Sequence, residues 1–435
     1  MNTLLQRIKA LIPRRIFTFF QPSYHYLMAL LGHLIYRMPS KHIKIIGITG
    51  TKGKSSTTEL VDAVLKAQGY KTAVAGTIRF SIGDDHESNL FKQTMPGRMY
   101  LQRFLRRAIQ ADCDWVIIEM TSEGAKQFRN RYLYLDALIV TNLRPEHLES
   151  HGGFENYKRA KLDIVLHSLA HSPKRPRAII ANADDPHYAD FIEQAGAEEQ
   201  YLFSTKAHSE AQIDKDGIDF VYQGEHIHSP LLGEHNFANI LATCSAGSFA
   251  GVSPQAIKAG IESMHLIPGR GQEIIMGQPF RVIVDYAHTN DSLEAIYQAW
   301  AGTSIVGILG ACGGGRDRWK RPDFGRIAQE HCRFVVLTNE DPYDEDPMQI
   351  IEDMEKGMDK SREGIDYIKI LDRREAFLEA FQSARSGEVI LITGKGTDPF
   401  IMGPRGSRER WSDVEVARET LAQLGYSHNT PTPQR

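Results

Sequence analysis

Residues 43–60 read Ile-Lys-Ile-Ile-Gly-Ile-Thr-Gly-Thr-Lys-Gly-Lys-Ser-Ser-Thr-Thr-Glu-Leu, and this stretch decides the fold of the first half of the chain. The run of isoleucines predicts a buried parallel strand, and the segment from Thr57 to Gln68 carries apolar residues at helical spacing. A strand, a glycine loop, Lys-Ser and a helix form the arrangement that cradles nucleotide phosphates, because backbone N–H groups and the helix N-terminus face the ligand. An ordinary glycine turn is the alternative; we predict ATP binding.

Particular roles follow for the residues of this loop. Lys54 is expected to reach the outer phosphates, and the Ser55 hydroxyl is expected to ligate Mg²⁺. The strict phosphate-loop pattern requires glycine where this chain has Ile48, so the loop is a variant. The residues predicted to bind the nucleotide here are Gly50, Thr51, Gly53, Lys54, Ser55 and Ser56.

A second buried-strand pattern, Trp115 to Ile118, ends at Glu119. A carboxylate at the C-terminal edge of a parallel strand, beside a phosphate loop, is placed to bind the metal of a metal–ATP complex. An ordinary strand-terminal acid is the alternative. We predict that Glu119 is a metal ligand.

The composition is that of a cytoplasmic enzyme. A length of 435 residues suggests two or three domains, and 51 basic against 54 acidic side chains give a net charge of −3. We therefore expect no nucleic-acid partner. The cysteines are far apart and form no C-x-x-C pair, which argues against a disulfide framework or a zinc ribbon; they are Cys113, Cys244, Cys312 and Cys332.

Residues 1–40 mix basic side chains with apolar ones. The apolar stretch from Tyr24 to Met38 is interrupted by His25, Gly32, His33 and Arg37, so we expect it neither to span a bilayer nor to act as a signal peptide. Two interpretations remain. The segment forms a pair of helices packed on the next domain, or a basic amphipathic segment that makes a peripheral contact with a membrane surface.

Several motifs follow one another along the chain: Thr49-Gly-Thr-Lys-Gly-Lys-Ser55, Thr141-Asn-Leu-Arg-Pro-Glu-His-Leu148, His151-Gly-Gly153, Tyr157, Ala160-Lys161 and Asp285-Tyr-Ala-His-Thr289. Together they resemble the motifs of the Mur ligase family, the ATP-dependent amide-forming enzymes of peptidoglycan synthesis, and within it those of the muramyl-tripeptide synthetases. The resemblance runs from Lys41 to the C-terminal helix. Family members carry an N-terminal domain that binds the UDP end of the substrate, and we expect residues 1–40 to be too few to form it.

The resemblance implies the following roles. His147 would bind a second Mg²⁺, and Lys161 would react with CO₂ to become a carbamate, an anionic oxygen ligand. Asn182, Asn236 and Asn239 would line the adenine pocket, where side-chain amides both donate and accept; a helix cap is the alternative for Asn236. Arg270 would approach the γ-phosphate, and Asp285 and His288 would complete the catalytic set, with Asp285 also near the nucleotide.

The chain also departs from the family pattern. Glu123 stands where the family has a histidine, and Glu146 replaces the usual Asp. Tyr343 replaces the arginine that clamps the second carboxylate of diaminopimelate, and the acids Asp341, Asp344, Glu345 and Asp346 favour a cationic substrate group, although a solvated loop is the alternative. The residues expected to contact substrate are Thr94, Lys320, Arg321, Asp341, Tyr343, Gly394 and Asp398.

We therefore predict an α/β protein with a short helical segment at residues 1–40, a central phosphate-loop ATPase domain at 41–266 and a Rossmann-like domain at 267–435. The active site is expected between the last two, in a monomer. The predicted activity is an ATP-dependent ligase that uses ATP, Mg²⁺ and carbamylated Lys161 to add an amino acid to a muramyl-peptide-like acceptor through an acyl phosphate. Alternatives are a folylpolyglutamate or poly-γ-glutamate type of ligase, and a nucleotide-dependent scaffold protein without ligation.

Overall fold

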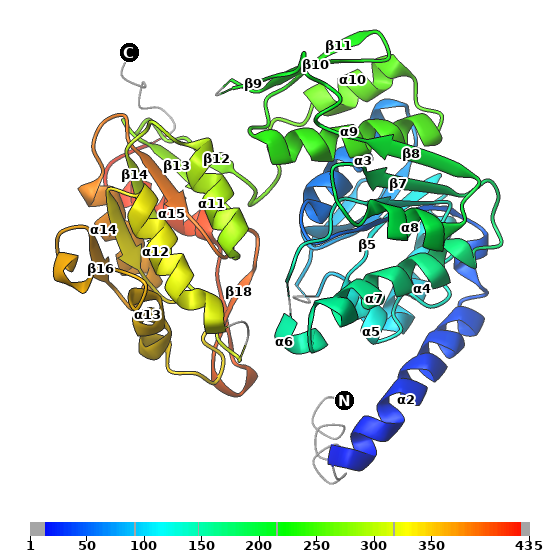
Figure 1. The fold of residues 1–435 in the computed structure, drawn as a ribbon, viewed down its shortest axis with the longest axis horizontal. Helices are drawn as coiled ribbons and strands as arrows, with labels where there is room; N and C mark the ends of the chain where they lie inside the picture. The colour runs from blue at the N-terminus through cyan, green and yellow to red at the C-terminus, as the bar shows by residue number, and fades with distance from the viewer. Residues whose placement is uncertain (1–13, 91–92, 147, 215, 316–317, 428–435) are drawn as a thin grey trace. The chain divides into compact units, whose positions relative to one another are not determined.

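The chain divides into two compact units (Figure 1). The computed structural model describes residues 14–90, 93–146, 148–214, 216–315 and 318–427. The first unit comprises residues 1–146 and 151–265, and the second comprises 147–150 and 266–435. Within the described residues, no helix combines the length and apolar character that crossing a membrane requires.

The central strand of the first unit is the one that leads into the phosphate loop. The eight strands lie in the order β4-β3-β2-β5-β1-β6-β7-β8, and β1 runs parallel to both of its neighbours. Only β3 and β4, at one edge, run antiparallel to the strands beside them. The strand bounds are β1 Lys44–Thr49, β2 Thr72–Ala75, β3 Arg79–Ile82, β4 Asp85–Ser88, β5 Trp115–Glu119, β6 Ala137–Val140, β7 Ala178–Asn182 and β8 Glu199–Phe203.

Helices cover both faces of this sheet (Figure 1). Helix α3 follows β1 and packs against α9 and α10, while α4, α7 and α8 lie on the other side. The helix bounds are α2 Arg14–Ile35, α3 Lys54–Ala67, α4 Arg98–Gln110, α5 Ser122–Lys126, α6 Leu148–His151, α7 Phe154–Ile164, α8 Tyr188–Ala195, α9 Glu234–Phe249 and α10 Pro254–Glu262. Short helical turns are η1 Pro39–Lys41 and the π-helical η2 Val165–Ala170. A small antiparallel sheet adds β9 Gln212–Ile213, β10 Ile218–Tyr222 and β11 Glu225–Ser229.

The second unit is built on a six-stranded sheet in the order β12-β13-β17-β14-β15-β16. All of its strands are parallel except β12, so the carboxyl ends of β13, β17, β14 and β15 meet at one edge. The strand bounds are β12 Gln272–Ile274, β13 Arg281–Val284, β14 Ile305–Leu309, β15 Phe334–Leu337, β16 Tyr367–Lys369, β17 Val389–Ile392, β18 Phe400–Met402 and β19 Arg408–Arg410. The helix bounds are α11 Asn290–Ala299, α12 Arg321–His331, α13 Pro347–Glu355, α14 Arg373–Ser383 and α15 Asp413–Gln423, with short turns η3 Arg318–Lys320, η4 Lys360–Arg362 and η5 Pro404–Gly406.

The predicted α/β class is confirmed. The isoleucine-rich strand is buried along almost its whole length, as a strand covered on both faces should be. The helix after the loop begins at Lys54 rather than Thr57, because Gly53 takes a left-handed conformation and acts as its N-cap. In the N-terminal segment, the described part contains helix α2 and the turn η1; residues 1–13 lie outside the described range, so the predicted pair of helices stays a prediction.

Candidate functional site

The phosphate loop joins β1 to α3 and requires glycine at two positions. Gly50 and Gly53 have φ angles of 144° and 81°. A Cβ atom at Gly50 would collide with the Thr141 hydroxyl, and one at Gly53 would collide with the carboxamide oxygen of Asn239. The N-cap residue of α3 is Gly53, which has no side chain to cap the helix. This is the backbone geometry that receives an anion.

Lys54 begins α3 and folds its side chain back over the loop. Its Nζ donates to the carbonyl oxygens of Gly50 at 3.1 Å and Thr51 at 2.8 Å. The Thr51 hydroxyl lies 3.0 Å from the hydroxyl of Tyr157 on α7. The loop thus holds an ammonium group against its own carbonyl oxygens, and the phosphate-binding role of Lys54 stays a prediction.

Ser55 and Glu119 are brought together by the pairing of β1 with β5. The register places Glu119 beside Ile48, the strand residue just before the loop. The Ser55 hydroxyl donates to the two carboxylate oxygens of Glu119 at 3.1 and 3.2 Å, and both side chains are buried. The backbone N–H of Thr77 donates to the same carboxylate at 2.8 Å. Thr94 lies one hydrogen bond away, since its hydroxyl is 2.7 Å from that of Thr77.

Lys161 comes from α7 to the same loop. Its side chain is 1% exposed, and its Nζ donates to the carbonyl oxygen of Gly50 at 2.7 Å. The ammonium position lies 4.9 Å from the centre of the Tyr157 ring. Burial, and then the charge of Lys54, hold the pKa of Lys161 well below its ordinary value, although Glu146 opposes the shift. A lysine of lowered pKa is a nucleophilic amine rather than a surface cation.

His147 lies outside the described residues, so its predicted metal role stays a prediction. The neighbouring His151 is described: its Nε2 is 3.2 Å from a carboxylate oxygen of Glu123, and its ring stands edge-on to Tyr157. The acid that replaces the family's histidine is therefore paired with another histidine of the same unit.

The three asparagines expected around adenine hydrogen-bond within the protein. Asn182 donates to the carbonyl oxygen of Thr141 and accepts from the N–H of Asp184. Asn239 is buried, accepts from the Thr57 hydroxyl at 3.3 Å and donates to Asn236 at 3.3 Å. The side chain of Asn239 lies so close to Gly53 that it leaves no room for a Cβ atom there, which supports a role of Asn239 in shaping the loop. Adenine binding by these residues stays a prediction.

In the second unit, the loop after β13 is held by Asp285. Its carboxylate accepts from the N–H groups of Gly271 and Ala287, each at 2.7 Å. The Arg270 guanidinium stacks on the Tyr286 ring at 4.4 Å, and Nδ1 of His288 donates to the carbonyl oxygen of Tyr286 at 2.7 Å. Arg270, Asp285 and His288 are thus brought together in one loop cluster.

A buried acidic cluster lies at the carboxyl ends of β15 and β17. Lys395 pairs with Asp341 at 2.8 Å and with Asp398 at 3.1 Å, and these charges raise its pKa against the opposing effect of burial. Glu340 adds a third carboxylate; burial, and then the charge of Asp341, raise its pKa to about 7. Its Oε2 has no hydrogen-bond partner among the described residues, and a Cβ at Gly394 would collide with it.

Glu340 is the site residue that sequence reasoning missed. It follows β15 by three positions and stands next to Asp341, which was singled out. A carboxylate just past a buried parallel strand was the available signal, the same one that identified Glu119.

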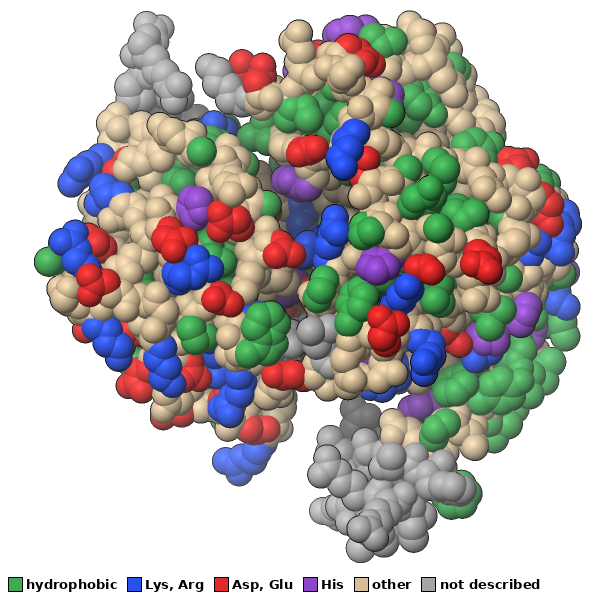
Figure 2. Space-filling view, viewed as in Figure 1, with side chains coloured by type: hydrophobic (Ala, Val, Ile, Leu, Met, Phe, Trp, Pro, Cys, Tyr) green, Lys and Arg blue, Asp and Glu red, His purple; other side chains and the backbone are tan. Residues whose placement is uncertain are grey.

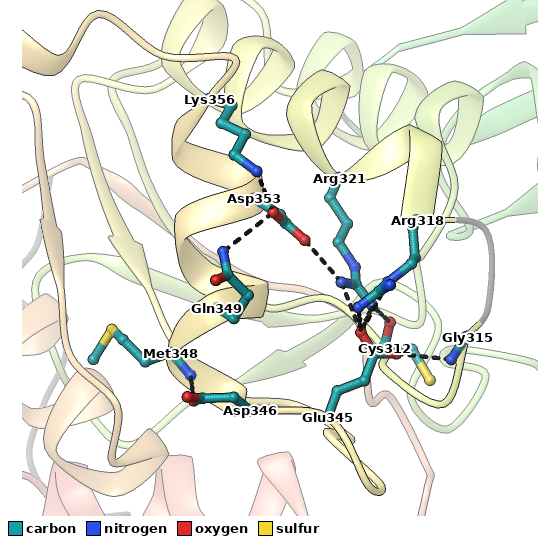
Figure 3. A network of polar contacts seen from close by, with 10 residues as sticks. All are labelled: Cys312, Gly315, Arg318, Arg321, Glu345, Asp346, Met348, Gln349, Asp353 and Lys356. Carbon is teal, nitrogen blue, oxygen red and sulfur yellow. Dashed lines mark hydrogen bonds and ion pairs between the residues drawn. The ribbon is translucent and has the colours of Figure 1, made fainter.

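Arg321 has a different environment from the one expected. Its side chain is 1% exposed, and its guanidinium donates to Glu345 at 3.1 Å, to Asp353 at 3.0 Å and to the carbonyl oxygen of Cys312 at 3.1 Å (Figure 3). Glu345 also accepts from the N–H of Gly315 at 2.7 Å. These contacts tie the segment from Cys312 to Gly315 to Glu345 and α13, and the substrate contact expected of Arg321 stays a prediction.

Lys320 and Tyr343 flank this network. The Lys320 ammonium lies 5.7 Å from the centre of the Phe324 ring, and its substrate contact stays a prediction. Tyr343 has φ 53° and donates its N–H to the carbonyl oxygen of Met402 at 2.9 Å. Its loop is therefore fixed by backbone contacts, and its part in amino-acid choice also stays a prediction.

The acids of this run also make contacts within the protein. Asp344 accepts from the N–H of Arg405, Asp346 caps α13, and Glu345 and Asp341 are ion-paired as described. Each of these four acids thus holds its own loop, and their attraction for a cationic substrate group stays a prediction.

Comparison with known proteins agrees with this geometry. The model of the Mur ligase middle domain matches residues 48–247, and that of the Mur ligase, glutamate ligase domain matches residues 269–396. A relative from Syntrophomonas wolfei, UDP-N-acetylmuramoyl-L-alanyl-D-glutamate--2,6-diaminopimelate ligase, is 35% identical over 91% of this chain and 81% of its own length. The UDP-N-acetylmuramyl-tripeptide synthetase of Roseiflexus sp. is 32% identical over 93% of this chain and 84% of its own.

Solved structures show the same fold. A UDP-N-acetylmuramoyl-L-alanyl-D-glutamate--2,6-diaminopimelate ligase matches with a TM-score of 0.59 at 28% identity, covering 88% of this chain and 79% of that one. Mycobacterium tuberculosis folylpolyglutamate synthase matches with a TM-score of 0.68 at 18% identity, over 85% of this chain and 92% of that one, a likeness of fold alone. The two domain models and the identity to the relatives settle the family: this chain belongs to the Mur ligases.

Proposed function

We propose that this protein is an ATP-dependent, ADP-forming ligase that joins an amino acid to the carboxylate of a muramyl-peptide-like precursor of peptidoglycan. Membership of the Mur ligase family supports the reaction class, and the relatives named above support the acceptor class.

One observation carries the proposal: three parts of a phosphoryl-transfer site meet at the end of β1. They are the uncapped start of α3, the Ser55–Glu119 pair and the buried amine of Lys161. Because phosphoryl transfer depends on positioning and charge stabilisation, a cradle of N–H groups with oxygen ligands and lysines is the equipment it needs.

The residues present suit Mg²⁺ and ATP. The Ser55 hydroxyl and the Glu119 carboxylate are hard oxygen donors, and they already lie within hydrogen-bonding distance of each other. Bound Mg²⁺ would supply charge neutralisation at the phosphates. The loop N–H groups and Lys54 would hold the phosphates themselves.

The chemistry divides between activation and attack. A carboxylate is a poor acylating agent because its leaving group would be oxide; transfer of the γ-phosphoryl group makes an acyl phosphate, which releases phosphate when an amine attacks. Lys54 would stabilise the charge that develops on the transferred group.

The modification we propose for Lys161 follows from its lowered pKa. The neutral amine attacks CO₂, forming an N–C bond and losing a proton to water, and the product is a carbamate anion. Lys54 and Lys161 both donate to the carbonyl oxygen of Gly50, so a carbamate on Lys161 would form an ion pair with Lys54. Its oxygen would be a further ligand for Mg²⁺, in addition to Ser55 and Glu119.

The folylpolyglutamate alternative has weaker support, because that likeness is confined to the fold.

We also infer that the enzyme works as a monomer.

The test is a turnover assay with defined substrates. The purified chain is incubated with ATP, Mg²⁺, one acceptor (muramyl-dipeptide-type or folate-type) and one amino acid, and both ADP and the amide product are measured, the latter by mass spectrometry. An amide product with a muramyl acceptor is expected. Product only with folate, or ADP without any amide, would overturn the proposal.

A further inference from the structure

Helix α2 presents two apolar faces, of which one is packed. Ala29 is 1% exposed, and a Cβ at Gly32 would lie 3.3 Å from the backbone of Met99 on α4. His33 is buried and stacks on the Tyr132 ring at 4.8 Å. This face attaches the helix to the first unit, so the helix has a fixed orientation on the protein.

The opposite face carries large apolar side chains in contact with solvent. Tyr24, Leu27, Leu34 and Ile35 are 57%, 50%, 50% and 58% exposed, and half-buried Leu31 lies among them. At 100° per residue these positions fall within an arc of about 100° on one side of the helix. Figure 2 shows apolar side chains gathered in the region where Figure 1 places α2.

The sequence up to the end of this helix and shortly beyond it carries charge of one sign. Seven Lys and Arg residues and no Asp or Glu precede Ile45, and the first acid of the chain is Glu59. The whole chain nevertheless has a net charge of −3, so the positive charge is concentrated in this segment.

We propose that the exposed face of α2 docks on the surface of an anionic lipid bilayer. An apolar stripe with aromatic residues inserts at the boundary between headgroups and acyl chains, and neighbouring basic residues are attracted to anionic headgroups. A second copy of the chain fits less well, because two such segments would bring positive charges together with no acid before Glu59 to pair with them. This inference is independent of the ligase activity.

The probe is a set of lipid vesicles, with the full chain as the protein. Binding is measured by co-sedimentation with vesicles of phosphatidylcholine alone and of phosphatidylcholine with phosphatidylglycerol, at low salt and at 0.5 M salt. We expect at least tenfold stronger binding to the anionic vesicles, weakened by salt. Equal binding to both vesicle types, or binding to neither, would overturn the proposal.

Two variants test the face itself. The triple variant Tyr24→Ser, Leu27→Ser, Leu34→Ser should bind anionic vesicles at least tenfold more weakly, and Leu27→Glu alone should weaken binding in the same direction. Unchanged binding by both would overturn the proposal.

A matched control removes three exposed apolar side chains elsewhere: Val221→Ser, Ile275→Ser, Ile365→Ser, which start at 46%, 61% and 60% exposure. The control should bind as the parent does, and all variants should keep the parent's circular dichroism and thermal midpoint. A loss equal to that of the α2 variant would overturn the assignment to α2. If light scattering shows that the parent is a dimer and that the α2 substitutions dissociate it, the partner of this face is a second copy of the chain and the bilayer proposal is overturned.

Discussion

Replacing Lys161 with Met should change how the stability of the protein depends on pH. Burial and the charge of Lys54 hold the pKa of Lys161 well below its ordinary value. Between that lowered pKa and about 10.4, the unfolded chain binds a proton that the folded protein does not. The free energy of unfolding therefore falls as pH falls, by up to about 1.4 kcal/mol per pH unit. This loss of stability reaches its full size below the pKa of Lys161 in the folded protein, and it is absent above the pKa of the lysine in the unfolded chain.

The Lys161→Met variant removes this effect and keeps a side chain of similar length. The difference between the unfolding free energies of the two proteins therefore reports the interactions of Lys161 with its surroundings. On going from pH 9.5 to pH 8.0, the parent should lose stability relative to the variant, by at most about 2 kcal/mol.

Urea denaturation followed by circular dichroism measures this difference, in buffers freed of CO₂ so that no carbamate forms. The control is Lys158→Met on the same helix, whose ammonium pairs with Asp190 at 2.6 Å; its difference from the parent should stay constant over this range. Parallel stability curves for the parent and Lys161→Met would refute the assignment of a lowered pKa.

Three further predictions concern the two units. Lys54→Ala should lower ADP release by about 10²-fold or more without lowering the thermal midpoint, and near-parental turnover would contradict the phosphate-loop assignment. Arg373→Met should cost about 3–5 kcal/mol in urea denaturation, because it leaves Asp413, now paired at 3.0 Å, as a buried uncompensated charge; a loss under about 1 kcal/mol would contradict this. The parent should prefer lysine or a neutral amino acid over diaminopimelate, by about 10²-fold, and Tyr343→Arg should shift product ratios toward the diacid in mass spectrometry. Diaminopimelate as the parent's best donor would contradict it.

The phosphate-loop half of the site could be predicted because its signals are local. The glycines, Lys54 and Ser55 follow one another in the chain, and Glu119 follows a buried strand whose parallel pairing with β1 brings its end to the loop. For these residues, the order of the strands and the chemistry of the side chains were sufficient to predict that they lie close together.

The second unit was harder because its chemistry depends on contacts between distant segments. Arg321 has the sequence context of a surface cation, and only folding brings Glu345 and Asp353 around it. Glu340 follows a buried strand as Glu119 does, but its burial beside Gly394 depends on the fold and cannot be predicted from that pattern. Sequence pattern reports neither which acids already have partners nor which have none.

The contact between Asn239 and Gly53 makes the phosphate loop depend on a helix far along the chain. Mutational histories of the two positions should therefore be coupled: a library randomised at both and selected for nucleotide binding should return glycine at 53 wherever 239 keeps a side chain of asparagine's size. The left-handed φ of Gly53 adds a second reason for glycine, one that no change at 239 removes. Substitution at position 239 of α9 is thus constrained by its contact with the phosphate loop, a separate segment of the chain.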